Sequence, residues 1–224
     1  MKDNKTSQPA HEYDDNITKT MPHYHLFHQS ALDLIAVACP EPAVWLDTGC
    51  GTGTFVQKAA QRFPTTRFEL ADPSDAMLEL AREKLAGRGA GYHLAGTEYL
   101  QLPDSSLDVI TAILAHHYYP DQQGRRRAAR NCYRMLKTGG LYVNFESFLP
   151  TTERGREVAL EVWRRAQVAG GKSEANAAKH LKRCGVEFFP ATIEAGVSIL
   201  KETGFAVVEV FWLSGMQYGV YGIK

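Results

Sequence analysis

Two carboxylates and a run of alternate glycines are the residues best placed to bind a charged small molecule. Asp47 ends an apolar run, and Gly49, Gly51 and Gly53 follow at alternate positions. Glycine adopts positive φ without steric cost and lets the backbone approach a ligand closely. A second acid, Asp72, ends the next apolar run, about twenty residues after the turn. This pattern predicts a strand, a tight turn and a helix N-terminus, which together cradle nucleotide-like ligands.

The position of Asp47 indicates the charge of that ligand. A dinucleotide site follows the pattern G-x-G-x-x-G and must hold a pyrophosphate, which a carboxylate just before the turn would repel. The pattern here is G-x-G-x-G, and Asp47 would attract an ammonium or sulfonium group. Asp72 is placed to bind both ribose hydroxyls. The residues therefore predict a positively charged nucleoside such as S-adenosylmethionine, and a glycine-rich turn without a ligand is the alternative.

The elements that would hold these residues alternate along the chain. Apolar runs predict strands at 44–47, 67–71, 92–95, 107–114 and 141–145, and helical periodicity predicts helices at 55–62, 75–85 and 122–136. Such alternation is typical of an open, mostly parallel sheet with helices on both faces. Three further helices are expected at 152–169, 173–184 and 192–203, with Thr151 and Ser173 as N-caps, followed by strands at 206–212 and 217–223.

Length and composition favour one domain with inserted elements. The 224 residues divide into a helical N-terminal arm (1–40), a cofactor-binding core (41–148), a helical lid (149–204) and two C-terminal antiparallel strands (205–224). The formal net charge is zero, so no overall field attracts nucleic acid. The four cysteines form no C-x-x-C motif, which argues against zinc and for a reducing compartment. The polar N-terminus and the absence of a long apolar stretch predict a cytoplasmic protein.

Two adjacent histidines are the candidates for a general base. His116 and His117 follow the predicted strand 107–114 and would lie near the reacting group. An imidazole with an ordinary pKa of about 6.5 accepts protons at neutral pH. Because neighbouring residues at a strand end point apart, we expect at most one to face the substrate. Packing or hydrogen bonding alone is the alternative for both.

Other residues are candidates by position. His23, His25 and His28 cluster near the start of a helix, but no acid or cysteine completes a metal site, so we expect none. The dense basic run at 125–130 is expected to be a solvated helix face, with a weak tRNA contact as the alternative. The further cofactor-binding candidates are Thr48, Pro73, Met77, Thr97, Glu98 and Ala115, with Thr97 or Glu98 near the adenine, and the substrate-binding candidates are Tyr13, His28, Tyr118 and Tyr218.

The chain resembles the class I, Rossmann-like S-adenosylmethionine-dependent methyltransferases. The segments that carry the resemblance are LDTGCGTG, LADPSDAML, LPDSSLDVITAILAHHYY and RMLKTGGLYV, within residues 44–145. The resemblance implies a seven-stranded sheet and S-adenosylmethionine as cofactor, with S-adenosylhomocysteine as product. It also implies that Asp47 and the turn 49–53 face the methionine part of the cofactor and Asp72 its ribose.

A narrower resemblance links nearly the whole chain to the carboxy-S-adenosylmethionine synthase branch, which serves tRNA wobble-uridine modification. It rests on MPHY at 21–24, ESF at 146–148 and the tail FWLSGMQYGVYGIK, and it implies that Tyr24 contacts the cofactor. The chain departs from this branch with ADPS in place of IDNS and with AILAHHYY in place of an asparagine-containing segment. Arg183 is the candidate for the arginine that holds the extra carboxylate.

Three functions follow from these patterns. Methyl transfer to a small molecule is favoured by the cofactor turn, the neutral charge and the helical lid. Synthesis of carboxy-S-adenosylmethionine is the first alternative, and a non-catalytic cofactor-binding module is the second. Arms at both ends of the chain favour a homodimer.

Overall fold

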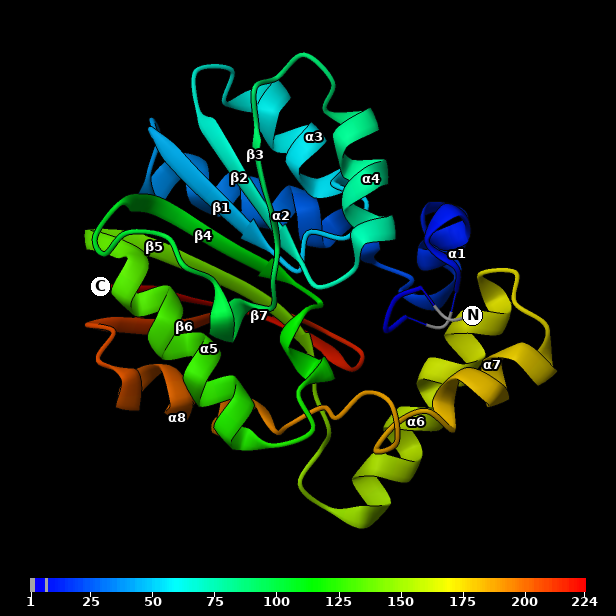
Figure 1. Cartoon of the computed structure of the whole chain (residues 1–224). Coiled ribbons are helices and arrows are strands. Elements are labelled where there is room, and N and C mark those ends of the chain that lie inside the picture. The colour runs from blue at the N-terminus through cyan, green and yellow to red at the C-terminus, as the bar shows by residue number, and fades with distance from the viewer. Residues whose placement is uncertain (1–2, 7) are drawn as a thin grey trace.

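A single seven-stranded sheet forms the centre of the computed structural model, which describes residues 3–6 and 8–224. Its strands lie in the order β3-β2-β1-β4-β5-β7-β6, and only β7 runs antiparallel to its neighbours (Figure 1). The expected mostly parallel α/β fold is confirmed. The strands are β1 (Val44–Thr48), β2 (Arg67–Asp72), β3 (Gly91–Leu94), β4 (Leu107–Ile113), β5 (Leu136–Ser147), β6 (Val207–Ser214) and β7 (Gln217–Ile223).

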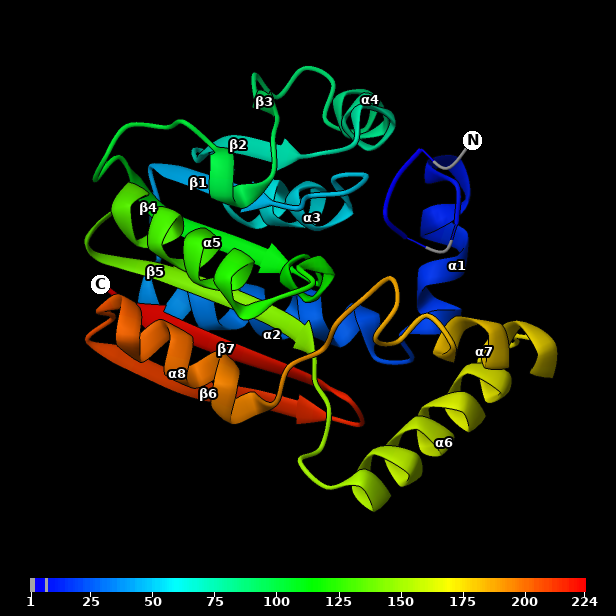
Figure 2. The same ribbon diagram turned by 60° about the horizontal axis from the view of Figure 1, so that its bottom comes forward.

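Helices cover both faces of this sheet because its strands are apolar on both sides. One face packs on α2 (Tyr24–Ala38), α3 (Thr54–Arg62) and α4 (Asp75–Lys84), around the buried Trp45 and Phe27. The other face packs on α5 (Gln122–Met135) and α8 (Ile193–Thr203), around Leu46 and Tyr142. Figure 2 shows α5 and α8 side by side in front of the sheet.

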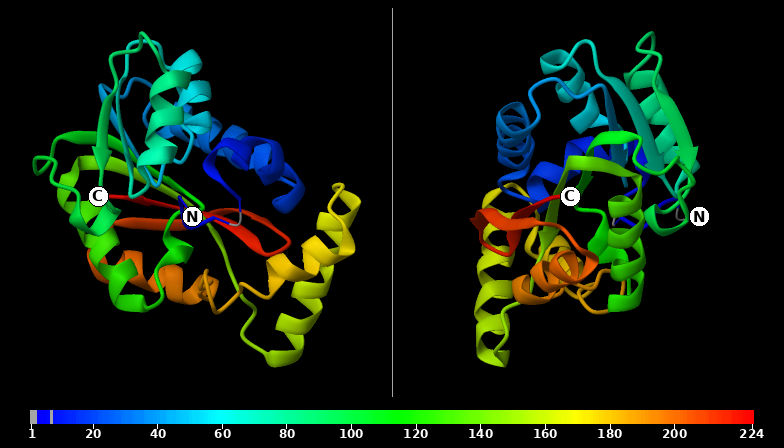
Figure 3. Two further views of the ribbon diagram at one scale, coloured as in Figure 1. Left: turned by 45° about the vertical axis from the view of Figure 1, so that its right-hand side comes forward. Right: turned by 90° about the vertical axis from the view of Figure 1, so that its left-hand side faces the viewer.

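The remaining helices gather beyond the carboxyl ends of the parallel strands. They are α1 (Tyr13–Thr20), α6 (Glu153–Ala169) and α7 (Glu174–Leu181), with the short 3-10 helix η1 (Ala10–Glu12) before α1. Trp163 of α6 donates from its indole nitrogen to the carbonyl of Thr20, 2.8 Å away, so the two chain segments meet there. Figure 3 shows α6 and α7 projecting from the body of the sheet.

Four sequence predictions differ from the structure. Strand β5 begins at Leu136 and not at 141, because Thr138, Gly139 and Gly140 continue the strand. The N-cap of α6 is Thr152, not Thr151, and it accepts from the amide of Gly155. The helix that begins after Ser173 ends at Leu181 instead of 184. Helix α8, expected in the lid, packs on α5 and β6.

In the ranges 3–6 and 8–224, no helix is long and apolar enough to cross a bilayer.

We predict that Gly49→Ala destabilises the fold by several kcal/mol, because two costs add. Gly49 has φ of 66°, where an L side chain is strained by roughly 1–2 kcal/mol. A Cβ there would also lie 2.3 Å from the Cβ of Ala115. Gly87→Ala is the matched control, because Gly87 has φ of 80° but nothing within 4 Å of its added Cβ. Urea denaturation of both variants checks this, and equal losses would contradict the role of close packing.

Candidate active site

A cavity of about 490 Å³ opens at the carboxyl ends of β1, β2 and β4. Its size lies within the 300–1,000 Å³ typical of small-molecule pockets. The predicted site residues that line it are Tyr13, Gly49, Gly51, Asp72, Pro73, Met77, Thr97, Glu98, Ala115, His116, His117 and Tyr118. The predicted residues outside this lining are Tyr24, His28, Asp47, Thr48, Gly53 and Tyr218.

Asp72 joins the glycine turn to the start of α4. Its Oδ2 accepts from the amide of Gly51 at 3.0 Å, and its Oδ1 accepts from the amide of Ser74 at 2.9 Å. Ser74, the N-cap of α4, accepts from the amide of Met77. Burial raises the pKa of Asp72 above its usual range, against the two amide bonds. Each carboxylate oxygen keeps a lone pair for a ligand hydroxyl in the cavity.

Asp47 is buried beneath the turn that it precedes. Its Oδ1 accepts from the hydroxyl of Thr111 at 2.5 Å, and Thr111 in turn accepts from the indole nitrogen of Trp45. Burial raises the pKa of Asp47 to about 7, assisted by the charge of Asp72 and opposed by Thr111. Because the folded pKa exceeds the unfolded value, the free energy of unfolding without ligand should fall as the pH rises from about 4 towards 7.

The raised pKa of Asp47 makes cofactor affinity depend on pH. A cationic ligand favours the ionised carboxylate, so S-adenosylmethionine should bind about tenfold more weakly at pH 6 than at pH 8. Calorimetry over this range checks the prediction. Asp47→Asn is the matched control, because the titration of the ligand's own amino group is the same for both proteins. Parallel curves for the two proteins would contradict the coupling to Asp47.

A chain of buried hydroxyls and one histidine crosses the floor of the cavity. The hydroxyl of Thr48 lies 2.6 Å from that of Thr97, which lies 3.0 Å from Nε2 of His116. Nδ1 of His116 lies 3.1 Å from the hydroxyl of Tyr142. Burial lowers the pKa of His116. With both ring nitrogens engaged and the neutral form favoured, His116 has a structural role in this arrangement.

His117 has a different environment from its neighbour. Its Nδ1 lies 3.2 Å from Oε2 of Glu146, and both side chains are buried. Oε1 of Glu146 accepts from the amide of His116 at 2.9 Å. Burial acts to raise the pKa of Glu146, but the neighbouring His117 and the charges of His116 and Arg125 lower it, so the carboxylate is ionised. A carboxylate on Nδ1 leaves Nε2 of His117 as the nitrogen available to a substrate.

Local backbone geometry brings both histidines to the cavity. Leu114 has φ of 56°, a left-handed conformation that is rare for a residue with a side chain. The chain then enters the 3-10 helix η3 (His116–Tyr118) instead of continuing as a strand. Both residues line the cavity. The expectation that at most one of them faces the substrate stays a prediction.

The aromatic residues of the N-terminal arm form one cluster beside the turn. The hydroxyls of Tyr13 and Tyr24 are hydrogen-bonded to each other, and burial raises the pKa of both. His28 lies behind Tyr24, with ring centroids 4.4 Å apart. Nδ1 of His28 is 3.1 Å from Nζ of Lys58, and burial lowers its pKa to about 3. His23 and His25 are exposed.

The first helix is fixed to the glycine turn by a polar clamp that sequence reasoning missed. Oδ1 of Asp14 accepts from the hydroxyls of Thr52 and Thr54, at 2.8 and 3.0 Å. Oδ2 of Asp14 accepts from Nζ of Lys84 on α4 at 2.6 Å. Burial opposes these bonds, but they lower the pKa of Asp14. The spacing between Asp14 and Lys84 offers no local signal, because their contact depends on the tertiary fold.

The polar segment before η1 roofs the cavity. Asp3, Asn4, Lys5, Thr6 and Gln8 are among its lining residues. The hydroxyl of Ser74 donates to the carbonyl of Asp3 at 2.6 Å. These contacts place a segment without apolar periodicity directly over the predicted cofactor site.

Arg183, which follows α7, forms part of the wall on the lid side. Its Nη2 donates to the carbonyl of Lys5 at 3.0 Å, and its Nε lies 3.1 Å from Oε2 of Glu187. A hydrogen bond from Arg183 also reaches the hydroxyl of Tyr118. The lid therefore brings a half-buried guanidinium to the cavity. There it contacts Tyr118, the residue that follows His117 in η3.

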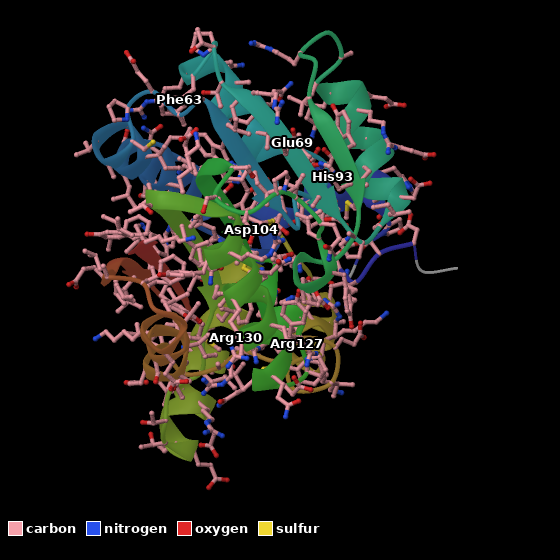
Figure 4. The ribbon with its side chains drawn as sticks, turned by 60° about the vertical axis from the view of Figure 1, so that its left-hand side comes forward. Phe63, Glu69, His93, Asp104, Arg127 and Arg130 are labelled. Atoms are coloured by element: carbon pink, nitrogen blue, oxygen red, sulfur yellow. The ribbon has the colours of Figure 1, made fainter. Side chains whose placement is uncertain are left out.

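The basic run on α5 divides between two surroundings. Arg125 donates to the carbonyl of Phe189, and Arg126 pairs with Glu202 of α8. Arg127 and Arg130 are exposed, and Figure 4 shows both on the outer side of α5. Tyr218 is on β7 and packs beneath α8, with its hydroxyl close to Gly196 of that helix.

A metal site in a protein needs several ligand side chains close together. Across the part of the chain that the structure describes, no group of three or more His, Cys, Asp or Glu residues could hold a metal ion. Near the sheet edge, Nε2 of His93 lies 2.8 Å from Oε2 of Glu69, on the neighbouring strand (Figure 4). Arg67 completes this contact at 3.1 Å from the same carboxylate.

Comparison with known proteins decides the family. A methyltransferase domain profile matches residues 46–140, which contain the glycine turn, Asp72 and both histidines. Over these residues the chain carries a class I S-adenosylmethionine-dependent methyltransferase domain. Its cofactor is therefore S-adenosylmethionine, and S-adenosylhomocysteine is the product.

Three relatives illustrate the range of this methyltransferase's neighbours. Carboxy-S-adenosyl-L-methionine synthase of Nautilia profundicola is 21% identical over 90% of this chain and 86% of its own. Demethylmenaquinone methyltransferase of Thermotoga maritima is 28% identical over 81% and 77%. A Nostoc punctiforme structure classed as an O-methyltransferase has a TM-score of 0.68 at 17% identity, covers 96% of this chain, and is matched over 60% of its own length.

The residues of the methyltransferase fit the cofactor by their shape and charge. A Cβ at Gly51 would meet nothing within 4 Å, so the turn leaves open space on the cavity side. Asp72 faces the same space, and its carboxylate suits ribose hydroxyls. Asp47 lies below and supplies a titratable negative charge.

Proposed function

We propose that this methyltransferase acts on a small molecule whose acceptor atom carries a proton, with His117 as the general base. The observation that carries this proposal is the contact of 3.2 Å between Nδ1 of His117 and Oε2 of the buried Glu146 at the cavity wall. A carboxylate that holds one ring nitrogen orients the other towards the substrate and stabilises the imidazolium that forms. Glu146 is therefore a positioning residue in this proposal.

The expected chemistry is a direct displacement assisted by proton removal. When bound, S-adenosylmethionine supplies a methyl group that is already activated by the sulfonium. Nε2 of His117 takes the proton of the attacking hydroxyl or amine, and Glu146 balances the resulting charge. The cavity walls hold the acceptor in line, which contributes through orientation, and residues 3–6 and 8 together with α7 exclude water.

Cofactor binding is assigned to the turn and its two acids. In this proposal Asp72 accepts from both ribose hydroxyls, and Gly49 and Gly51 allow the methionine part to approach the backbone. Asp47 attracts the positive charge, while Thr97 or Glu98 lies near the adenine. Tyr13 covers the sulfonium with its aromatic face, a contact worth about 0.5–2 kcal/mol, and Tyr24, outside the cavity lining, is hydrogen-bonded to Tyr13.

The experiment is a transfer assay with defined acceptors. Purified protein is incubated with S-adenosylmethionine and with panels of phenols, alcohols, amines and thiols, and S-adenosylhomocysteine is quantified by mass spectrometry. We expect product only with acceptors that lose a proton, and none from their O- or N-methylated counterparts. Equal turnover of blocked and unblocked acceptors would overturn the role of His117.

Synthesis of a carboxylated cofactor is the second candidate function, and the position of Arg183 favours it. The guanidinium lies on the cavity wall with Tyr118, where it would suit an extra carboxylate. The Nautilia relative carries that activity in its name. Mass spectrometry of nucleosides released from the purified protein separates the two functions, because the carboxylated cofactor is heavier. Recovery of S-adenosylmethionine or S-adenosylhomocysteine alone favours methyl transfer.

A further inference from the structure

A second, smaller cavity lies behind Glu146, on the side of the sheet covered by α5 and α8. Its volume is about 40 Å³. Polar side chains from β5 and α5 line it, among them Asn144, Glu146, Ser147 and Arg125. His116 borders this cavity as well as the larger one. Glu146, which is proposed to hold His117, lines the second cavity, and it contacts His117, which lines the first.

One polar atom at this cavity has no partner within the protein. Oδ1 of Asn144 is buried and has no hydrogen bond among the described residues. The side chain is only 8% exposed. A buried polar group without a partner costs about 1–3 kcal/mol, so such groups are usually satisfied by an ordered water.

The size and polarity of the cavity suit water better than an apolar occupant. One water needs about 10–15 Å³ of such volume and two to four polar partners. The cavity offers 40 Å³. An acceptor at Asn144 and charges of both signs at Arg125 and Glu146 supply the partners.

Charge coupling crosses the same space. Burial lowers the pKa of His116, and the charges of Arg125 and His117 lower it further. The charges of Glu146 and Glu98 raise it. Arg125 also counters the effect of burial on Glu146. No direct contact between Arg125 and Glu146 is needed for this coupling if water bridges the cavity.

We propose that the second cavity binds ordered water that joins Asn144 and Glu146 to Arg125, and that Arg125 is thereby a positioning residue for the His117–Glu146 pair. The importance for catalysis rests on the proposed role of His117, whereas the water site and the charge coupling do not. In this proposal Arg125 belongs to a buried polar network around the second cavity, although it is part of a basic run in the sequence.

The water site is tested by a crystal structure at a resolution that orders buried waters. We expect density within hydrogen-bonding distance of Asn144 Oδ1. The Asn144→Leu variant should lose that density, because an apolar side chain replaces the amide acceptor. A dry cavity in the wild-type protein overturns the proposal and leaves the transfer assay with His117 unaffected.

The positioning role is tested by NMR titration of His116 in the protein without substrate. Arg125→Gln removes the charge and should shift the titration midpoint of His116 upwards. Arg125→Lys should restore the wild-type midpoint, and Arg127→Gln, an exposed neighbour on α5, should leave it unchanged. An unchanged midpoint in Arg125→Gln overturns the coupling. Because neither readout needs an acceptor, this failure is distinguishable from failure of the proposed function.

Discussion

His117→Gln is expected to lower kcat about 100-fold, equivalent to about 2.7 kcal/mol of transition-state stabilisation. Glutamine retains a polar side chain but cannot take the proton from the acceptor. The KM for S-adenosylmethionine should change little, because the predicted cofactor contacts lie on the turn and on Asp72. Steady-state kinetics with the best acceptor from the transfer assay provide the measurement, and thermal unfolding checks that the variant is folded.

Two companion variants separate a base from a structural residue. Glu146→Gln should lower kcat about tenfold, because the amide still accepts from the backbone of His116 but carries no charge to balance the imidazolium. His116→Gln should affect stability more than kcat, since both nitrogens of His116 are engaged with Thr97 and Tyr142. A kcat within about threefold of wild type in His117→Gln would refute proton removal by this residue.

Asp72→Ala is expected to weaken binding of S-adenosylmethionine and S-adenosylhomocysteine about 100-fold. Hydrogen bonds to a charged group are worth about 1.5–3 kcal/mol each, and the variant loses two that the ribose would make. It also leaves the amides of Gly51 and Ser74 without their acceptor, so some loss of stability is expected. Isothermal titration calorimetry with both ligands is the measurement.

The design for Asp72 includes two comparisons. Asp72→Asn keeps an acceptor for one amide and should recover stability without recovering full affinity, since the charge is absent. Asp75→Ala, on the exposed first turn of α4, is the matched control and should bind normally. Normal affinity in a folded Asp72→Ala protein would remove this residue from the ribose site.

Local sequence patterns predicted the cofactor half of the molecule well. The alternation of apolar runs and helical periodicity predicted the mostly parallel sheet, because burial on both faces requires apolar strands. The glycine spacing predicted positive φ at Gly49, Gly51 and Gly53, and all three have it. These features depend on residues close in sequence, so a single chain is enough to predict them.

The pairing of His117 with Glu146 illustrates what local patterns miss. His117 lies in η3 just after β4, and Glu146 lies near the end of β5, in a strand that reads as an ordinary apolar run. The left-handed Leu114, for which no glycine gave a signal, turns both histidines into the cavity. Only strand pairing of β4 with β5 brings base and carboxylate together.

The sequence by itself determined the sheet, the glycine turn and the acids that define the cofactor, because these arise from periodicity and short spacing. Tertiary structure alone decided what closes the cavity. The polar segment 3–8 has no amphipathic pattern, yet Ser74 and Arg183 bind its carbonyls, and Asp14 clamps α1 to Lys84. Such contacts form between residues that meet only after the sheet and helices have packed, so their partners are set by the fold and not by neighbouring residues.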